Sequence, residues 1–311
     1  MTINILFAGS QADWPVYKVE LTKALVNQGV DARLCDTMNP EDVDYIIYAP
    51  DGPLTDFSRY MRCKAVLGLW AGVERIVSNP TLRQPLARMV DAGLREGMVE
   101  WVTGHVLRYH LGMDQHILNQ DGVWRDKTAA PLARSRTVGI LGLGALGAAC
   151  ARALVRLNFN VVGWSRRPKD IDRIECMWGE SGLHDVIRQS DILVLLLPDT
   201  RTTANTLDAE TLALLPKGAR IINPGRGTLI DDEALLDALN AGQVGHATLD
   251  VFREEPLPIN HPFWAHPNVT VTPHIASSTR PDTASDFVAE NISRHERGLS
   301  LIGLVDRSVG Y

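Results

Sequence analysis

The sequence predicts an α/β protein made of two parallel-sheet domains with a cleft between them. Residues 1 to about 95 alternate strand-like and helix-like segments, which is typical of βαβ units. A second series begins with the aliphatic run 137–141, which ends in a G-x-G-x-x-G motif and is followed by an alanine-rich segment. The unbroken aliphatic run 192–197 is typical of a strand covered on both faces. A chain of 311 residues is long enough for two such domains.

The composition argues against several classes of protein. The chain is 45% hydrophobic and 22% charged, as globular proteins are. Its net charge of −6 disfavours binding to nucleic acid or to anionic membranes. The first residues resemble a strand rather than a signal peptide, and no aliphatic run is long enough to cross a bilayer. The cysteines lie far apart and form no metal or redox motif, so we expect a cytoplasmic protein with four ordinary thiols, at Cys35, Cys63, Cys150 and Cys176.

In the first half, strands are predicted where short β-branched or aliphatic runs lie between turn residues. An amphipathic helix is predicted over residues 15–27, because Gly29 directly after it is typical of a helix C-terminus. Another helix is expected near residues 56–62. The strands are expected at residues 3–8, 32–35, 45–48 and 65–69.

A long helix is predicted over residues 98–118, because apolar residues recur there at spacings of three and four. Its place between two α/β halves suggests that it crosses from one domain to the other. A last helix is expected over residues 282–297, packed back on the first domain. The expected domains are therefore residues 1–97 with 282–311, which would bind substrate in a flavodoxin-like fold, and residues 98–281, which would bind a dinucleotide.

The second half continues the alternation of strands and helices. A helix is expected over residues 231–240, because three acidic residues at its start suit a helix N-terminus. Another is expected over residues 208–214. Besides the two aliphatic runs, strands are expected at residues 160–164, 219–223, 245–251 and 269–272.

The G-x-G-x-x-G motif predicts a dinucleotide site, because a strand precedes it and a helix follows it. Gly142 allows the tight turn, Gly144 lets the backbone approach a pyrophosphate, and Gly147 lets the helix pack close to the sheet. The N–H groups at the start of the helix, from Ala145 and Leu146 onward, are expected to face the phosphates.

The end of the next strand favours NADP over NAD. An NAD site places an acidic residue about 20 residues after the first glycine, where it binds the ribose hydroxyls. Here Ser165, Arg166 and Arg167 occupy that position, so no carboxylate repels a 2′-phosphate and two guanidinium groups can bind it. The alternative is a pair of solvated surface arginines.

Four polar segments directly follow predicted strands, at residues 223–227, 250–252, 254–258 and 272–276. In open α/β sheets, ligands bind outside the carboxyl ends of the strands. The segments supply an arginine that can hold a carboxylate, a histidine that can exchange a proton and a carboxylate that can orient the histidine. This set fits carbonyl reduction. The alternative is turn chemistry for the arginine and simple packing for the histidine.

In their order and spacing, these motifs resemble those of the D-isomer-specific 2-hydroxyacid dehydrogenase family. The resemblance covers nearly the whole chain, including residues 71–73 and 98–100. It is strongest to the glyoxylate/hydroxypyruvate reductase branch, in residues 264–269 and in the closing residues 305–311. It implies two Rossmann-like domains, a nicotinamide cofactor, a small 2-keto acid as substrate and a homodimer formed through the crossing helix.

The resemblance also implies a role for each site residue. Arg226 would clamp the carboxylate and carbonyl of the substrate, His274 would be the acid/base, and Glu255 would be the partner of that histidine. Glu255 is chosen over Glu254 because it directly precedes the proline. Asp250 would hold the nicotinamide. The resemblance implies further contacts to the cofactor from Leu197, Pro198 and Ala276, and to the substrate carboxylate from the backbone of Ala71, Gly72 and Val73.

The substrate pocket departs from the family pattern at Trp70, where the family usually has a small residue. Related reductases often carry an aromatic residue near the position of Ala49. The large side chain would then stand on one wall of the pocket, at Trp70, instead of on the other, at Ala49. The alternative is that Trp70 fills a domain interface.

Two other functions are consistent with the motifs. Family-related corepressors use this fold as a dinucleotide-sensing binding module, and other family members act on phosphite or formate. The short termini and the reductase-like closing segments favour the reductase. No metal site is predicted, and the remaining histidines are expected to be structural or solvated, namely His105, His110, His116, His184, His246, His261 and His266.

Overall fold

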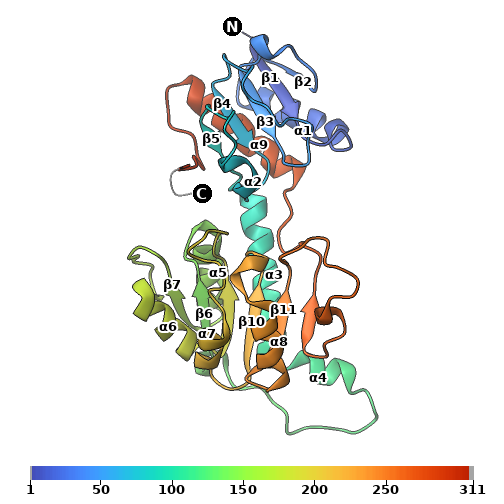
Figure 1. Cartoon of the computed structure of the whole chain (residues 1–311), viewed down its shortest axis with the longest axis vertical. Helices are drawn as coiled ribbons and strands as arrows, with labels where there is room; N and C mark the ends of the chain where they lie inside the picture. Colours follow the sequence, from blue (N-terminus) through green and yellow to red (C-terminus); the bar gives the residue numbers. More distant parts are fainter. Residues whose placement is uncertain (1, 308–311) are drawn as a thin grey trace. The chain divides into compact units, whose positions relative to one another are not determined.

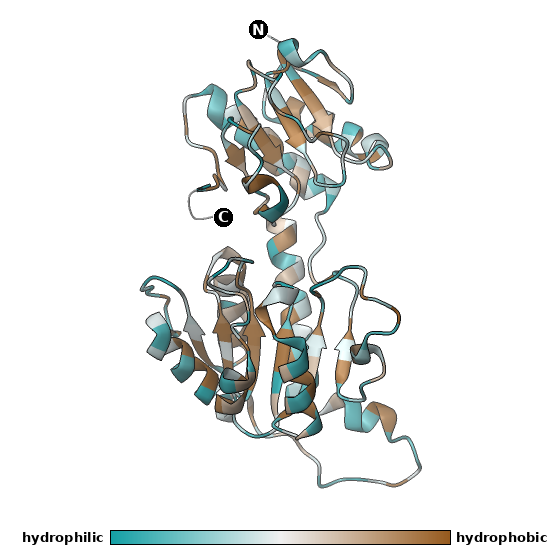
Figure 2. Cartoon of the chain, viewed as in Figure 1, coloured by the Kyte–Doolittle hydropathy of each residue, from teal (hydrophilic) through white to brown (hydrophobic). Residues whose placement is uncertain are grey.

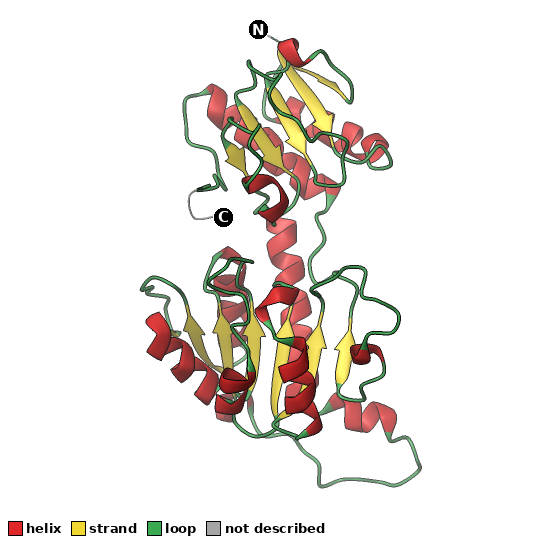
Figure 3. Cartoon of the chain, viewed as in Figure 1, coloured by secondary structure: helices red, strands yellow, loops and turns green. Residues whose placement is uncertain are grey.

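The computed structural model describes residues 2–307, and the chain divides into two compact units (Figure 1). Unit 1 contains the residues up to Leu94 and those from Ser278 onward, and unit 2 is Arg95–Ser277. Each unit has its own parallel sheet with helices (Figure 3), so the predicted fold class of two parallel-sheet α/β domains is confirmed. Hydrophobic residues concentrate on the strands of both sheets (Figure 2).

Unit 1 has a five-stranded parallel sheet in the order β2-β1-β3-β4-β5, which is the flavodoxin-like strand order. Helix α9, although it comes from the end of the chain, shares a hydrophobic core with α1 and the strands, in which Leu21, Val288 and Phe7 are buried. The strands are β1 Ile3–Ala8, β2 Ala32–Cys35, β3 Tyr45–Tyr48, β4 Ala65–Gly68 and β5 Leu86–Ala87; the helices are α1 Trp14–Asn27, α2 Glu74–Val77, α9 Pro281–Glu296 and the short 3₁₀ helix η1 Pro40–Asp42.

The helix expected over residues 56–62 is absent, and this prediction is wrong. The segment is a series of separate turns, in which Tyr60 donates its N–H to the carbonyl of Phe57 at 3.1 Å and Cys63 donates its N–H to the carbonyl of Tyr60 at 3.1 Å. Ser58 donates its N–H to Oδ1 of Asp56 at 2.9 Å, and Phe57 donates its N–H to Oγ1 of Thr81 at 2.9 Å. Side-chain acceptors of this kind compete with helix formation. The short elements α2 and β5 were not predicted.

Unit 2 has a seven-stranded parallel sheet in the order β12-β11-β10-β9-β6-β7-β8, which contains the doubly wound order of a dinucleotide-binding fold. The order reverses between β6 and β9, so the G-x-G-x-x-G motif lies at the topological switch point. The strands are β6 Thr137–Leu141, β7 Asn160–Trp164, β8 Glu175–Met177, β9 Ile192–Leu195, β10 Ala219–Asn223, β11 Val244–Leu249 and β12 Val269–Val271.

The helices of unit 2 match the sequence predictions except in three places. The predicted helix 98–118 is two helices, α3 and α4, because Gly112 between them adopts a left-handed conformation with φ +62°. Helix α3 also begins earlier, where the Asp91 carboxylate accepts the N–H groups of Gly93 and Leu94. Strand β8 and helix α6 were not predicted. The helices are α3 Ala92–His110, α4 Met113–Leu118, α5 Ala145–Arg156, α6 Gly179–Gln189, α7 Ala209–Leu214 and α8 Asp232–Asn240, with 3₁₀ helices η2 Ala133–Ser135, η3 Gly227–Leu229 and η4 Pro262–Trp264.

No helix within residues 2–307 has the length and apolar character needed to cross a membrane.

Candidate active site

The glycine motif has the geometry of a phosphate-binding turn. Gly142 has a φ of +109°, and a Cβ there would lie 2.4 Å from the carbonyl oxygen of Leu196. A Cβ on Gly147 would lie 1.9 Å from the carbonyl oxygen of Gly142, so only glycine lets α5 pack this close. By contrast, nothing lies within 4 Å of the position that a Cβ on Gly144 would take. Since α5 begins at Ala145 with unpaired N–H groups, the turn fits a pyrophosphate.

A positively charged loop follows β7, next to the glycine turn. Arg166 and Arg167 are exposed there, whereas the Ser165 hydroxyl is used within the loop, donating to the carbonyl of Arg167 at 2.7 Å. Lys169 donates from Nζ to the carbonyl of Leu143 at 2.6 Å and so ties this loop to the glycine turn. The sequence analysis missed Lys169, although it stands in the same basic run. The cations fit a phosphate on the adenosine ribose.

Three further residues were predicted to contact the cofactor, and those contacts stay predictions. Two of them, Leu197 and Ala276, are buried in separate hydrophobic clusters of unit 2. Pro198, after β9, accepts a hydrogen bond on its carbonyl from the Thr203 hydroxyl at 2.6 Å.

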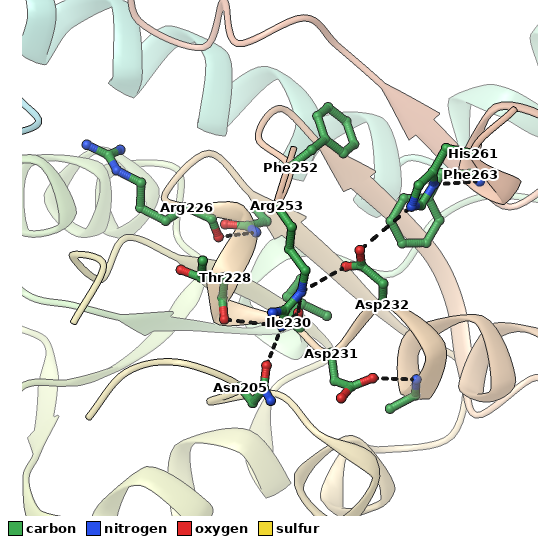
Figure 4. A network of polar contacts seen from close by, with 12 residues as sticks. Asn205, Arg226, Thr228, Ile230, Asp231, Asp232, Phe252, Arg253, His261 and Phe263 are labelled. Atoms are coloured by element: carbon green, nitrogen blue, oxygen red, sulfur yellow. Dashed lines mark hydrogen bonds and ion pairs between the residues drawn. The ribbon is translucent and has the colours of Figure 1, made fainter. Parts of the chain in front are cut away.

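Arg226 stands on a rigid turn directly after β10 (Figure 4). The Asn223 side chain builds this turn, because its Nδ2 donates to the carbonyl of Arg226 at 2.9 Å and its Oδ1 accepts the N–H of Gly225 at 3.1 Å. Arg226 is half-buried, and its Nη1 donates to the carbonyl of Gly225 at 2.7 Å. A fixed backbone and a partly desolvated guanidinium suit bidentate binding of a carboxylate.

His274 and Glu255 form a hydrogen-bonded pair. The distance from Nδ1 of His274 to Oε2 of Glu255 is 2.8 Å, and the other carboxylate oxygen of Glu255 accepts the N–H of Phe252 at 2.9 Å. The histidine side chain is 52% exposed and the glutamate side chain 35%. Because Nδ1 faces the carboxylate, Nε2 is the ring nitrogen that points away from Glu255. The sequence placed these two residues 19 positions apart, and the fold brings them together.

Asp250 is fully buried and holds the segment that carries His274. Its Oδ1 accepts the Thr272 hydroxyl at 2.6 Å and the N–H of Ile275 at 2.9 Å, and its Oδ2 accepts the N–H of Ala276 at 2.8 Å. Its carbonyl also accepts the N–H of His274 at 2.8 Å. These contacts make Asp250 a structural anchor of the histidine. The contact with a nicotinamide that the sequence suggested stays a prediction.

In unit 1, Trp70 and the turn 71–73 lie at the carboxyl end of β4. Trp70 is 41% exposed, and its backbone carbonyl accepts the N–H of Met89 at 3.0 Å. Trp70, Gly72 and Val73 line the same small hollow of about 10 Å³, together with Tyr48 and Pro50. Ala49, in contrast, is buried.

The family model described as "D-isomer specific 2-hydroxyacid dehydrogenase, NAD binding domain" matches residues 104–276. The chain belongs to this family. It is 40% identical to glyoxylate/hydroxypyruvate reductase A of Yersinia enterocolitica, over 87% of this chain and 88% of the relative. It is 36% identical to the protein of the same name from Klebsiella pneumoniae, over 99% of this chain and 100% of the relative. The predicted family and branch are thereby confirmed.

Solved structures of the family are similar over the whole chain. A D-isomer specific 2-hydroxyacid dehydrogenase from Xanthobacter autotrophicus, in complex with NADPH and MES, has a TM-score of 0.92 and 36% identity, with 100% of both chains covered. An NADPH-dependent glyoxylate/hydroxypyruvate reductase from Sinorhizobium meliloti, in complex with NADP and sulfate, has a TM-score of 0.84 and 32% identity, with 100% of this chain and 99% of that chain covered.

Proposed function

We propose that this protein reduces a small 2-keto acid of the glyoxylate or hydroxypyruvate type with NADPH and releases the D-2-hydroxy acid. The observation that carries the proposal is the His274–Glu255 pair, on the carboxyl edge of the sheet that also presents Arg226 and the glycine turn. The names of the relatives, and the NADPH and NADP in the solved structures, support it.

The chain's own residues carry out binding and proton transfer. Arg226 binds the carboxylate and the carbonyl oxygen of the keto acid and so polarises the carbonyl. His274 donates a proton from Nε2 to the carbonyl oxygen as the hydride arrives at the carbon. Glu255 accepts a hydrogen bond from Nδ1 and stabilises the imidazolium. When bound, NADPH supplies the hydride, and one proton is consumed per keto acid reduced.

We assign cofactor binding to unit 2 and substrate recognition in part to unit 1. The N–H groups of Ala145, Leu146 and Gly147 bind the pyrophosphate. Arg166, Arg167 and Lys169 bind the 2′-phosphate, which explains a preference for NADPH. In unit 1, the backbone of residues 71–73 binds the substrate carboxylate, and Trp70 forms a wall of the pocket.

The test is a panel of 2-keto acids with the oxidation of NADPH and of NADH followed spectroscopically. We expect turnover of glyoxylate or hydroxypyruvate and a higher kcat/KM with NADPH. Binding of NADPH without turnover of any 2-keto acid would favour a dinucleotide-sensing module instead. A kcat/KM with NADH equal to or above that with NADPH would contradict the assignment of the basic loop.

We also propose a homodimer, formed through α3 and the segment 111–132 that follows it. Helix α4 in this segment has no buried residue, and Trp124 is 90% exposed. Apolar side chains exposed together suit contact with another protein surface. The exposed large apolar side chains of the segment are Leu111, Met113, Ile117, Leu118, Val123, Trp124 and Leu132.

A cytoplasmic location is proposed as well. All four cysteines lie within the described residues and are free thiols, which suits a reducing compartment.

A further inference from the structure

Glu255 is carried by a long connection between β11 and η4, residues 250–261, which we call the Glu255 loop. A second connection, residues 224–231 between β10 and α8, carries Arg226 and is called the Arg226 loop. The sequence gives no sign that these loops touch. In the structure they are joined by a network of polar contacts around Arg253 (Figure 4).

The two loops are in direct backbone contact at Gly227. A Cβ on Gly227 would lie 2.0 Å from the carbonyl carbon of Phe252 and 2.4 Å from the nitrogen of Arg253. Phe252 is also the residue whose N–H binds Oε1 of Glu255. The Glu255 carboxylate is therefore fixed to a piece of backbone that itself rests on the Arg226 loop.

The side chain of Arg253 fastens this contact. Its Nε donates to the carbonyl of Ile230 at 3.2 Å, and its Nη2 contacts the carbonyls of Ile230 and Thr228 and the side-chain oxygen of Asn205. A planar guanidinium can serve several acceptors at once, which a lysine cannot. In Figure 4, Arg226 extends away from the Arg253 guanidinium, so the two arginines have different targets.

One carboxylate lies near two residues of the Glu255 loop, one on each side of Glu255 in the sequence. Asp232, in the first turn of α8, lies with Oδ1 3.7 Å from Nε of Arg253 and with Oδ2 3.7 Å from Nε2 of His261. Burial raises the pKa of Asp232, and the charges of Arg253 and His261 oppose that rise. Asp231 beside it faces the helix instead, accepting the N–H of Ala234 at 3.0 Å.

We propose that Arg253 is a positioning residue, which fastens the Glu255 loop to the Arg226 loop and thereby holds the Glu255 carboxylate against His274. This proposal rests on the proposed function, because it concerns the same proton transfer. Small displacements of groups that orient an acid/base are costly to the rate. Arg253 therefore acts on catalysis through Glu255, since the contacts of its guanidinium are with the Arg226 loop, Asn205 and Asp232.

The first test is the Arg253→Gln variant. We expect kcat for keto-acid reduction to fall about 10-fold, with the KM for NADPH unchanged and the alkaline limb of the pH profile moved to lower pH. Glu254→Gln is the matched control in the same loop, since it also changes the charge by one unit, and its kcat should equal that of wild type. Wild-type kcat and pH profile in Arg253→Gln would overturn the proposal.

A double variant shows whether Arg253 acts through Glu255. In a Glu255→Gln background, Arg253→Gln should cost less than about twofold further in kcat, because the group that it positions is already altered. A full additional 10-fold loss would mean that Arg253 acts by another route and would contradict the proposal.

A measurement without substrate separates this proposal from the proposed function. The NMR titration of the His274 ring in the free protein, identified by the signal that His274→Gln removes, should have its midpoint at lower pH in Arg253→Gln. A lower melting temperature with an unchanged midpoint would show a merely structural role. If Arg253→Gln does not fold, Asp232→Asn gives the same test, with Asp231→Asn as its control. Failure of the wild-type protein to reduce any 2-keto acid would contradict the proposed function. The NMR titration of His274 would then still decide whether Arg253 positions Glu255.

Discussion

The proposed chemistry uses three side chains from three separate connections. Arg226 follows β10, Glu255 lies in the loop after β11, and His274 follows β12. Each is held by a neighbouring group: the Asn223 side chain for Arg226, the N–H of Phe252 for Glu255, and the carbonyl of Asp250 for His274. Substitutions at these positions therefore test chemistry more than folding.

Replacing Arg226 by lysine should not preserve activity. Lysine keeps the positive charge but loses the planar fork that binds a carboxylate and a carbonyl together. We expect kcat/KM for the keto acid to fall by about 100-fold or more, with little change in melting temperature. Steady-state kinetics and thermal denaturation measure the two effects. Near wild-type turnover in the lysine variant would show that Arg226 does not have the assigned role.

Replacing Glu255 by glutamine tests the proton donor through pH. Reduction needs a protonated His274, and the carboxylate 2.8 Å from Nδ1 stabilises the charged ring. The alkaline limb of the kcat/KM profile for reduction should therefore move to lower pH, and the acidic limb for oxidation should move the same way. An alkaline limb that stays in place or moves upward would rule Glu255 out as the charge partner.

Among the elements, α3 and β11 are joined by a buried polar contact that links stability to pH. Tyr109 of α3 lies with its hydroxyl 2.9 Å from Nδ1 of His246 and 2.5 Å from the Thr248 hydroxyl. Burial, with the positive charge of Arg108, lowers the pKa of His246 from 6.5 to about 4. His246 was expected to be structural or solvated, and its contact with Tyr109 is of the structural kind.

The sign of the resulting pH dependence follows from linkage. Between pH 6.5 and 4, the unfolded chain binds a proton at His246 that the folded chain does not, so the free energy of unfolding falls as the pH drops. After allowance for partial exposure, the loss is about 2 kcal/mol. In urea unfolding at a series of pH values, the free energy of unfolding should fall less between pH 6.5 and 4 for His246→Asn than for wild type. Parallel curves for the two proteins would contradict this account.

The sequence predicted long periodic elements and missed short or interrupted ones, for physical reasons. Strand β9 could be predicted because its residues are all aliphatic. Both faces of a central parallel strand are covered by helices, and all four residues of β9 are buried. Strand β8 has only three residues, one of them exposed, so its pattern is too short to recognise. Residues 56–62 have a helix-like pattern, but the chain there forms separate turns, closed by the N–H groups of Tyr60 and Cys63.

At the scale of the whole molecule, the order of the motifs along the chain predicted the family, and the two parallel sheets follow from it. What could not be predicted is which loops meet. Gly227 rests on Phe252, and Asp232 faces both Arg253 and His261, yet no periodicity or spacing relates these residues. Such contacts depend on how neighbouring strands place their carboxyl ends, and that is a property of the assembled sheet.

The proposed dimer gives a prediction at this scale. The wild-type protein should sediment at twice the mass of one chain. Ile117→Asp combined with Trp124→Asp places two charges among the exposed apolar side chains of the segment 111–132 and should shift the protein toward monomer. Val19→Asp is a control, because Val19 is also an exposed apolar residue, on α1 of unit 1. A wild-type monomer, or a double variant that stays dimeric, would contradict the assigned surface.

The backbone of His274 has a φ of +54°, in the left-handed region that glycine and asparagine occupy most readily. A residue with a larger side chain pays about 1 kcal/mol for this conformation. At position 274, selection for turnover therefore favours histidine, whereas selection for thermodynamic stability favours glycine. Gene copies released from selection for turnover are expected to lose this histidine sooner than Gly142 or Gly147, where a side chain would also meet backbone atoms.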